Sequence, residues 1–353
     1  MYRKYLLLLL IASLATPLLA QQPNVYPRPS QKAKVFQRIG TTDLEIEYHA
    51  PLANGRKVFG GLVVYNEKIH GEPHPWRAGA NENTIIRLAH DVQVNGQDLK
   101  AGTYGIHIFV SENDWQLVFS NDYENWGSFS YKPDADALRV KLTPEKAPFQ
   151  EWLSYRFINP KAEEVMVELH WANQRIQFNI STKVQANILA DVMKMETKTS
   201  AALMAAANAS LQLNPDDLNK AMQLTNQALA LEANMNAQIF KVRLLEKQGK
   251  TTEANAIRAR AIENAGPTEL FSYAMSLNNE GKQEECLKIL NLNLEKHPDH
   301  QFTYMGFGHY YRTLKDPRTV EYWKKAYEMA PESAKGFYYY QWGYAASQLD
   351  PPR

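Results

Sequence analysis

The chain has 353 residues, of which 44% are apolar and 22% charged, a composition typical of a folded protein with room for two domains, each with its own core. The formal net charge of +1 offers no basic surface for nucleic acid and no polybasic patch for a membrane. Cys286 is the single cysteine, which excludes an internal disulfide and every multi-cysteine metal motif, and no sequence motif calls for a cofactor.

The chain begins with MYRKYLLLLLIASLATPLLAQQ, which has the pattern of a secretory signal peptide. Arg3 and Lys4 form its positive start, and the apolar core from Leu6 to Leu14 is too short to span a bilayer. We expect cleavage after Ala20, which would remove residues 1–20, and no cysteine follows that could carry a lipid anchor. The sequence therefore predicts a periplasmic or secreted protein that is not inserted in a membrane after cleavage.

Residues 21–184 are predicted to form an all-β domain. The stretches LEIEYH (44–49), VMVELHW (165–171) and RIQFNI (175–180) alternate apolar and polar residues, which places Met166, Glu168 and His170 on a solvent-facing side. Six further short stretches read as strands, and NG at 95–96, AG at 101–102 and NDYENWG at 121–127 read as turns. Nine or more short strands with little helix predict an antiparallel β-sandwich or barrel.

A composite pattern, YxxP…GRxxFGxL…WRxGANExT…GxxLxAGTYxxxxF, runs through this domain. It includes Tyr48, Arg56, the string WRAGANENT (76–84) and AGTY (101–104). On these residues, roughly 29–180 resemble a family of bacterial secreted domains of unknown function, numbered twenty-nine eleven. The chain departs from the family pattern in NEKIHGEPHPW (66–76), which is longer than the usual approach to the tryptophan. The resemblance implies a shared fold and supplies no activity.

The residue types around WRAGANENT suggest a site for a small anionic or glycan ligand. Arginine forks suit carboxylates and phosphates, neighbouring polar groups supply hydrogen bonds, and aromatic rings offer stacking faces. The candidate ligand-binding residues are Tyr48, Arg56, Trp76, Arg77, Asn81, Glu82 and Thr84.

Two alternatives stay open at this point. In the first, the string is internal bracing: Gly79 permits a tight turn, Arg77 pairs with Glu82, and Trp76 covers one end of the domain. In the second, the protein is a hydrolase or lyase of envelope polymers, with Glu82 as acid or base and Arg77 steering the substrate. The sequence favours a protein that is not an enzyme.

Other catalytic patterns are weak. His70 and His74 are spaced by four, but Gly71 and Pro73 argue against the helix that would place both on one face, so we expect no metal site. The sequence contains no GxSxG, HExxH, Walker-type or GxGxxG motif. We therefore predict no catalytic residue.

Residues 185–209 are predicted to form a connecting helix, and residues 210–353 carry an internal repeat. Pairs of positions seven apart, beginning at Ala221, Ala254, Cys286 and Thr319, recur at steps of 33, 32 and 33 residues. This spacing resembles the tetratricopeptide (TPR) repeat, a helix–turn–helix unit of about 34 residues. Larger or polar residues replace the usual Ala or Gly at Val242, Cys286, Asn293, Phe307 and Thr319.

Repeats of this kind stack into a solenoid, and the family typically binds extended peptides or partner helices. A solenoid that only braces the β-domain is the alternative. The aromatic run FYYYQW (337–342) is predicted to cap the last repeat rather than to form a ligand platform. Together these features predict an exported, non-catalytic scaffold whose repeats bind a protein or peptide and whose β-domain holds a small ligand.

Overall fold

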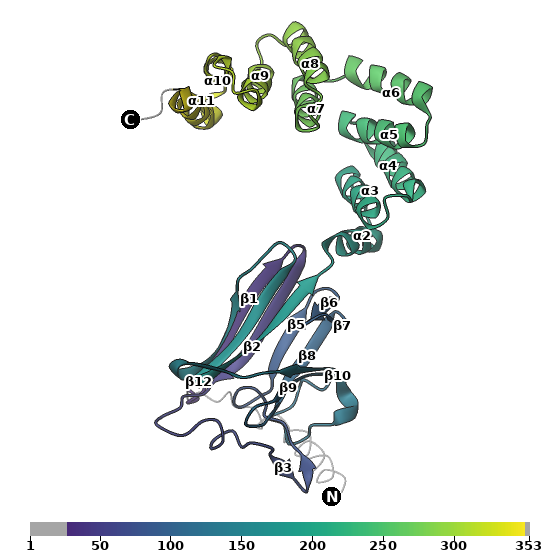
Figure 1. Ribbon diagram of the computed structural model, residues 1–353. Coiled ribbons are helices and arrows are strands. Elements are labelled where there is room, and N and C mark those ends of the chain that lie inside the picture. The colour runs from purple at the N-terminus through teal and green to yellow at the C-terminus, as the bar shows by residue number, and fades with distance from the viewer. Residues whose placement is uncertain (1–26, 350–353) are drawn as a thin grey trace, which may run out of the picture. The chain divides into compact units, whose positions relative to one another are not determined.

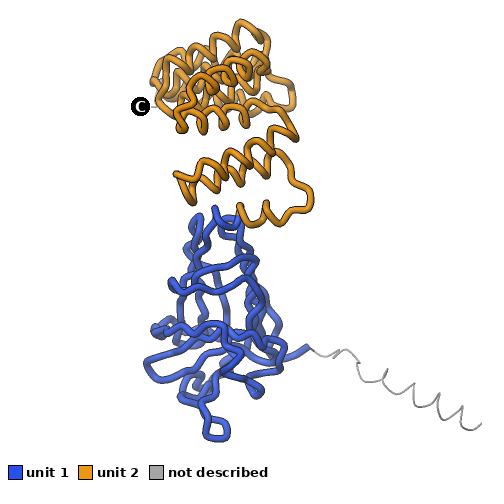
Figure 2. Tube along the Cα trace, turned by 90° about the vertical axis from the view of Figure 1, so that its right-hand side faces the viewer, with its two compact units in different colours: residues 1–187 blue, residues 188–353 orange. Residues whose placement is uncertain are grey.

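The computed structural model describes residues 27–349, and the predicted signal peptide lies outside the described residues. Figure 2 shows that the chain divides into two units, residues 1–187 and residues 188–353, which we call the β-unit and the helical unit. Each is considered by itself.

The β-unit consists of two main antiparallel sheets. The six-stranded sheet has the order β1-β2-β5-β8-β9-β10, the four-stranded sheet has the order β11-β12-β6-β7, and β3 and β4 form a small hairpin (Figure 1). The bounds are β1 Gln31–Ile39, β2 Thr42–Ala50, β3 Lys68–Ile69, β4 Glu72–Pro73, β5 Thr84–Leu88, β6 Val92–Val94, β7 Gln97–Leu99, β8 Gly102–Val110, β9 Trp115–Ser120, β10 Asp136–Leu142, β11 Glu145–Ile158 and β12 Glu164–Thr182. The predicted antiparallel fold is confirmed. Among residues 27–187 no strand pairing closes the sheets into a barrel, so of the two predicted architectures the sandwich is the correct one.

The core of the β-unit lies between its two main sheets. Leu44, Ile46 and Tyr48 alternate inward along β2, as their spacing predicts, and meet residues such as Tyr155 and Val167 of the other sheet. The NG turn joins β6 to β7, with Asn95 and Gly96 both at positive φ as a tight hairpin requires. The alternating pattern therefore identifies the inward face of β2 and the turn between β6 and β7.

Strand β12 differs from its prediction in two ways. The stretches 165–171 and 175–180 form one strand rather than two, because Ala172 adopts a positive φ of 50° near a register shift and the pairing with β11 continues past it. Glu168 and His170, predicted to face water, are buried. Side chains of Arg156, Arg175 and Gln177 and the carbonyl of Pro148 cover them.

The helical unit is built from antiparallel helix pairs. Its helices are α2 Val184–Lys194, which begins in the β-unit, α3 Ser200–Leu213, α4 Leu218–Leu231, α5 Met235–Lys247, α6 Thr251–Glu263, α7 Pro267–Asn279, α8 Gln283–Lys296, α9 Gln301–Thr313, α10 Arg318–Met329 and α11 Lys335–Leu349 (Figure 1). In place of the single helix predicted at 185–209 there are two, because Thr199 caps the start of α3 by accepting a hydrogen bond from the Ala202 amide. Helix α3 packs on α4, so the hairpins begin at Ser200 rather than at 210.

The small residues of the repeat lie where the pattern predicts. Ala221, Ala254, Cys286 and Thr319 are all buried on the second helix of their hairpins. Gly249 and Gly281 follow the first helices α5 and α7 with φ of 75° and 74°, a conformation that ends a helix and that glycine adopts without strain.

The α9–α10 hairpin solves its close packing differently. Phe307 is buried at the position where a small residue is usual. Its neighbours take over: a Cβ on Gly306 would lie 2.5 Å from Leu290 Cδ2, and a Cβ on Gly308 would lie 2.9 Å from the Trp323 ring. The two glycines therefore let α9 approach α8 and α10 in spite of the bulky residue between them.

Helix α11 closes the last hairpin. Tyr338 and Ala345 are buried in a cluster with Trp323 and Ala326 of α10, so the segment 337–342 belongs to a capping helix. The opposite side of α11 leaves several aromatic rings exposed.

Candidate functional site

WRAGANENT forms a loop that the β-unit holds firmly at its first residue. The backbone of Trp76 exchanges two 2.8 Å hydrogen bonds with Ile108, and its ring packs against Phe59 and Trp171 in the core. The indole Nε1 donates to the Gly79 carbonyl at 3.2 Å. Trp76 is therefore a bracing residue that is partly buried against the core.

Thr84 and Gly79 also brace the loop. Thr84 is fully buried, and its hydroxyl donates a hydrogen bond to the Ala78 carbonyl at 3.1 Å. The same carbonyl accepts a second hydrogen bond from the Tyr155 hydroxyl at 2.9 Å. A Cβ on Gly79 would lie 2.6 Å from Thr84 Oγ1 and 3.2 Å from the His49 carbonyl. Gly79 is thus required for close packing rather than for the tight turn that the sequence suggested. The positive φ values of the loop fall instead on Ala78 and Asn81.

The predicted pair between Arg77 and Glu82 does not form in the described part of the chain. Arg77 is half-buried, donates to the Asn81 carbonyl at 2.7 Å, and stacks its guanidinium on the rings of Trp126 at 5.1 Å and Phe129 at 5.8 Å. Burial lowers its pKa from the ordinary value of an arginine. The Asn81 side chain in turn donates to the Ser30 carbonyl at 3.3 Å.

Arg56 lies apart from the other candidates. Its guanidinium donates to the carbonyls of Ala53 and Leu52 at 2.9 and 2.7 Å, within its own loop. It stabilises that loop and does not join a common site.

Glu82 lies on the other side of the loop, with residues of β2. Its carboxylate accepts two hydrogen bonds from Arg28 at 2.6 and 2.7 Å and lies 3.4 Å from His49 Nε2. The Arg28 contacts lower the pKa of Glu82, whereas burial lowers the pKa of His49 despite that neighbour. At neutral pH the site therefore holds an ionised glutamate and an uncharged histidine.

A cavity of about 350 Å³ opens at this point. Its walls are Arg28, Lys32, Glu47, Tyr48, His49, Glu82 and Asn83. Asn83 is 6% exposed, and neither its amide nitrogen nor its amide oxygen has a hydrogen-bond partner among the described residues; the same holds for His49 Nδ1. Unpaired buried polar groups are costly, so their presence on a cavity wall indicates a place for a hydrogen-bonding ligand or for water. We call this the Asn83 cavity.

The charges of the Asn83 cavity are already paired. Glu82 holds Arg28, and Glu47 holds Lys32 at 2.6 Å. Burial alone would raise the pKa of Glu47, but its contact with Lys32 and nearby arginine and lysine charges outweigh it, and the pKa is lowered. Neither carboxyl is therefore poised as the protonated acid that glycoside hydrolysis needs, and Arg77 lines no part of this cavity.

Of the seven predicted site residues, only Tyr48 and Glu82 line the Asn83 cavity. The remaining lining residues are Arg28, Lys32, Glu47, His49 and Asn83. Arg28 lies 54 positions from its partner, and the sequence carries no signal for that pairing. Asn83 belongs to WRAGANENT, but the sequence does not show that its side chain is buried on a cavity wall.

A known family model matches most of the β-unit. Residues 30–180 match the model of a family described as a protein of unknown function, DUF2911. The resemblance of the N-terminal half is thereby confirmed, and the matched DUF2911 region contains the whole loop and, apart from Arg28, the whole cavity wall. No curated protein matches the sequence.

Solved structures with similar folds are helical-repeat proteins. One of them is the APC/C hetero-tetramer Cut9-Hcn1 (12% identity, 47% of this chain and 33% of that chain, TM-score 0.28). Another is YrrB, a TPR protein with an unusual peptide-binding site (20% identity, 40% of this chain and 74% of that chain, TM-score 0.25). A third is MamA (15% identity, 43% of this chain and 88% of that chain, TM-score 0.25). The chain spans a third of the Cut9-Hcn1 chain that it matches, and these scores are too low to support a functional argument. The TPR-like fold rests on the hairpins themselves.

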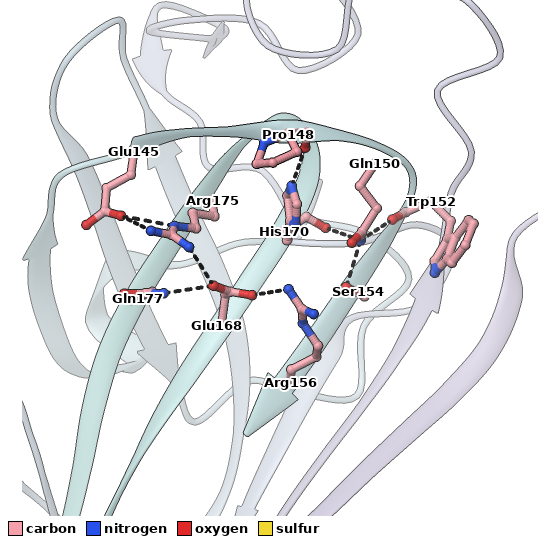
Figure 3. A network of polar contacts seen from close by, with 10 residues as sticks. All are labelled: Glu145, Pro148, Gln150, Trp152, Ser154, Arg156, Glu168, His170, Arg175 and Gln177. Carbon is pink, nitrogen blue, oxygen red and sulfur yellow. Dashed lines mark hydrogen bonds and ion pairs between the residues drawn. The ribbon is translucent and has the colours of Figure 1, made fainter. Parts of the chain in front are cut away.

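A second polar network lies on β11 and β12 of the DUF2911 region (Figure 3). The Glu168 carboxylate, 3% exposed, accepts hydrogen bonds from Arg156 and from Gln177 at 2.7 Å and lies 3.5 Å from Arg175. Burial alone would raise the pKa of Glu168, but the contacts with Gln177 and Arg156 outweigh it, and the pKa is lowered. These contacts join Glu168 to side chains of β11 and β12, so the network links the two strands.

Residues 27–349 contain no group of three or more His, Cys, Asp or Glu side chains arranged to hold a metal ion. In the same range no helix has the length and apolar character needed to cross a membrane. His70 and Gly71 form the positive-φ turn of the β3–β4 hairpin.

Proposed function

We propose that the protein is an exported scaffold that binds a protein or peptide partner through its helical unit. The observation that carries this proposal is the outer side of α11. Phe337, Tyr339, Tyr340 and Tyr344 are 53%, 62%, 66% and 45% exposed, and the rings of Tyr340 and Tyr344 stack at 6.4 Å. Aromatic residues are enriched in protein interfaces, so several exposed rings on one helix favour contact with a partner.

The stacking of the hairpins supports the same proposal. The side chain of Arg243 on α5 reaches Ser276 and Glu280 of the next hairpin at 2.6 and 2.5 Å, and Asn278 on α7 reaches Thr313 on α9 at 2.9 Å. Such contacts fix successive first helices to one another. A rigid row of helices pre-organises a binding surface, which lowers the entropic cost of association.

The experiment uses the full chain as bait for an extract of the cell envelope, followed by measurement of the affinity of the purified partner. We expect Tyr340→Ala/Tyr344→Ala to weaken that partner's binding about tenfold or more, because two interface rings are lost. The control is Phe36→Ala, which removes a ring of similar exposure from β1. A partner that binds the double variant as tightly as the original chain would refute a role for this surface.

For the β-unit we propose a small ligand in the Asn83 cavity. An unpaired amide offers one donor and one acceptor side by side, which suits a ligand group with the same pair, such as an amide or neighbouring hydroxyls. Since both cations of the cavity are paired, an uncharged ligand is favoured over the anionic one that the sequence suggested. Export itself is supported by the signal-like pattern of residues 1–20, and detection of the processed chain outside the cytoplasm tests it.

A further inference from the structure

A second and larger cavity lies in the β-unit, away from the Asn83 cavity. Its volume is about 1050 Å³, and it lies between the β3–β4 hairpin and the strands β8 to β10. We call it the hairpin cavity. Its aromatic walls are Phe109, Trp115, Phe129 and Tyr131.

Two exposed rings extend this cavity onto the surface. Trp126 and Phe129 belong to the loop between β9 and β10 and are 60% and 67% exposed. Their planes are inclined by only 13° and their centroids are 6.1 Å apart, so the two rings stack nearly parallel to each other, and we call this pair the aromatic platform. Phe129 is also part of the cavity wall, and the platform therefore leads directly into the hairpin cavity.

Arg77 supports the platform from one side. Its guanidinium lies over both rings, and Gly127 between them allows this approach, because a Cβ there would lie 2.9 Å from Arg77 Nη1. His74 also lies beside Phe129, with ring centroids 6.2 Å apart, but more than half of each platform side chain is exposed, so both rings remain accessible to a ligand. The arginine fixes two rings that would otherwise be free to rotate.

The far wall of the hairpin cavity is polar and ordered. Tyr131 donates to Asp136 at 2.6 Å, and Arg139 donates to Asp136, to the Tyr131 hydroxyl and to Gln116 at 2.6, 2.9 and 3.3 Å. The ionisable lining residues are balanced in charge, with Lys68, Arg139 and Lys141 against Glu67, Glu72 and Asp114. A binding site with this balance attracts neither anions nor cations strongly.

We propose that the aromatic platform and the hairpin cavity bind an uncharged oligosaccharide. The apolar C–H face of a pyranose ring stacks on an aromatic face, while its hydroxyl groups both donate and accept hydrogen bonds, as the polar wall does. Two neighbouring, nearly parallel rings beside a cavity offer contacts to more than one sugar of a chain. This site shares no residue with the Asn83 cavity or with α11, so it goes beyond the proposed function.

The full chain is titrated by calorimetry with uncharged hexasaccharides of glucose, mannose, xylose and N-acetylglucosamine, and with polygalacturonate as an acidic comparison. We expect at least one uncharged hexasaccharide to bind, and Trp126→Ala and Phe129→Ala each to weaken it about tenfold, since each removes one stacking face. The matched controls are Trp152→Ala and Phe149→Ala, whose side chains are 56% and 58% exposed elsewhere in the β-unit. These controls should bind as the original chain does.

Trp126→Tyr and Phe129→Tyr keep a flat ring and should retain binding, which separates loss of stacking from loss of folding. The proposal is overturned if none of the four hexasaccharides binds at millimolar concentration, if only the acidic polymer binds, or if the control variants lose binding equally. None of these results bears on the helical unit, and the Tyr340→Ala/Tyr344→Ala chain should bind the sugar normally.

Discussion

The two units differ in how far along the sequence their polar contacts reach. In the helical unit, hydrogen bonds between hairpins join residues one repeat apart: Asn234 to Ser200 across 34 positions, Arg243 to Ser276 across 33, and Asn278 to Thr313 across 35. In the β-unit, Arg28 reaches Glu82 across 54 positions, Tyr155 reaches Ala78 across 77, and Thr42 reaches Thr182 across 140. A contact that recurs at the repeat period is visible as a sequence period, whereas the β-unit contacts follow no period.

The units also differ in what they bury. The helical unit achieves close packing with alanine, glycine and one cysteine, and burial raises the pKa of the Cys286 thiol to about 11, so that this thiol is inert at neutral pH. The β-unit buries a carboxylate, several histidines and an unpaired amide. Buried amides also occur in the helical unit, at Asn278 and Asn293, so the Glu168 carboxylate and the histidines are what distinguishes the β-unit. Substitutions in both units test what these differences do for stability.

The largest effect is expected from the helical packing. Gly306→Ala places a Cβ against Leu290, which should reduce the free energy of unfolding by about 1–3 kcal/mol because the core is overpacked. The matched control is Gly343→Ala on α11, where nothing lies within 4 Å of the new Cβ. It should stabilise the chain by up to about 1 kcal/mol, since alanine favours a helix. Urea unfolding measures both, and equal effects would show that α9 does not depend on close approach.

The Glu168 network should make stability depend on pH. Because the pKa of Glu168 is lowered in the folded chain, its contribution is present above the pKa of an unfolded glutamate and is lost as the pH falls through the folded value. Glu168→Gln should therefore cost about 1–2 kcal/mol at neutral pH, a modest amount because both arginines are partly exposed, and much less in acid. Glu163→Gln, at an exposed position just before β12, is the control. A loss that is the same at all pH values would contradict an ionised Glu168.

The smallest effect has the opposite sign. Asn83→Leu removes an unpaired buried amide and should stabilise the ligand-free β-unit by about 1 kcal/mol. Asn187→Leu is the matched control, because that buried amide donates to Thr42 and Thr182 at 3.0 and 2.8 Å and its loss should destabilise. Thermal unfolding of the two variants distinguishes them. Destabilisation by Asn83→Leu would mean that the amide already has hydrogen-bond partners. The unpaired amide would then no longer support a ligand in the Asn83 cavity.

The candidate site illustrates why the sequence predicted only part of it. WRAGANENT was correctly singled out, but its residues serve three places: Trp76 and Thr84 pack in the core, Arg77 supports the aromatic platform, and Glu82 and Asn83 line the cavity. Neighbours along an irregular loop point in different directions, and no period relates them. Trp126 was read only as part of the turn at 121–127 and Phe129 was not singled out, although two aromatic residues in a polar loop are a signal that could have been followed.

The sequence by itself determined the division into a strand-rich half and a helical-repeat half, the inward faces of the strands and the small residues between paired helices. These properties follow from a period of two residues in strands, of about four in helices and of about 33 in the repeats. Each period can be read from the local sequence alone. Only the tertiary structure decided that the sheets form a sandwich, that Glu168 is buried, and that Arg28 rather than Arg77 holds Glu82. Those outcomes depend on which distant segments meet, and they are set by the packing of the whole β-unit rather than by any stretch within it.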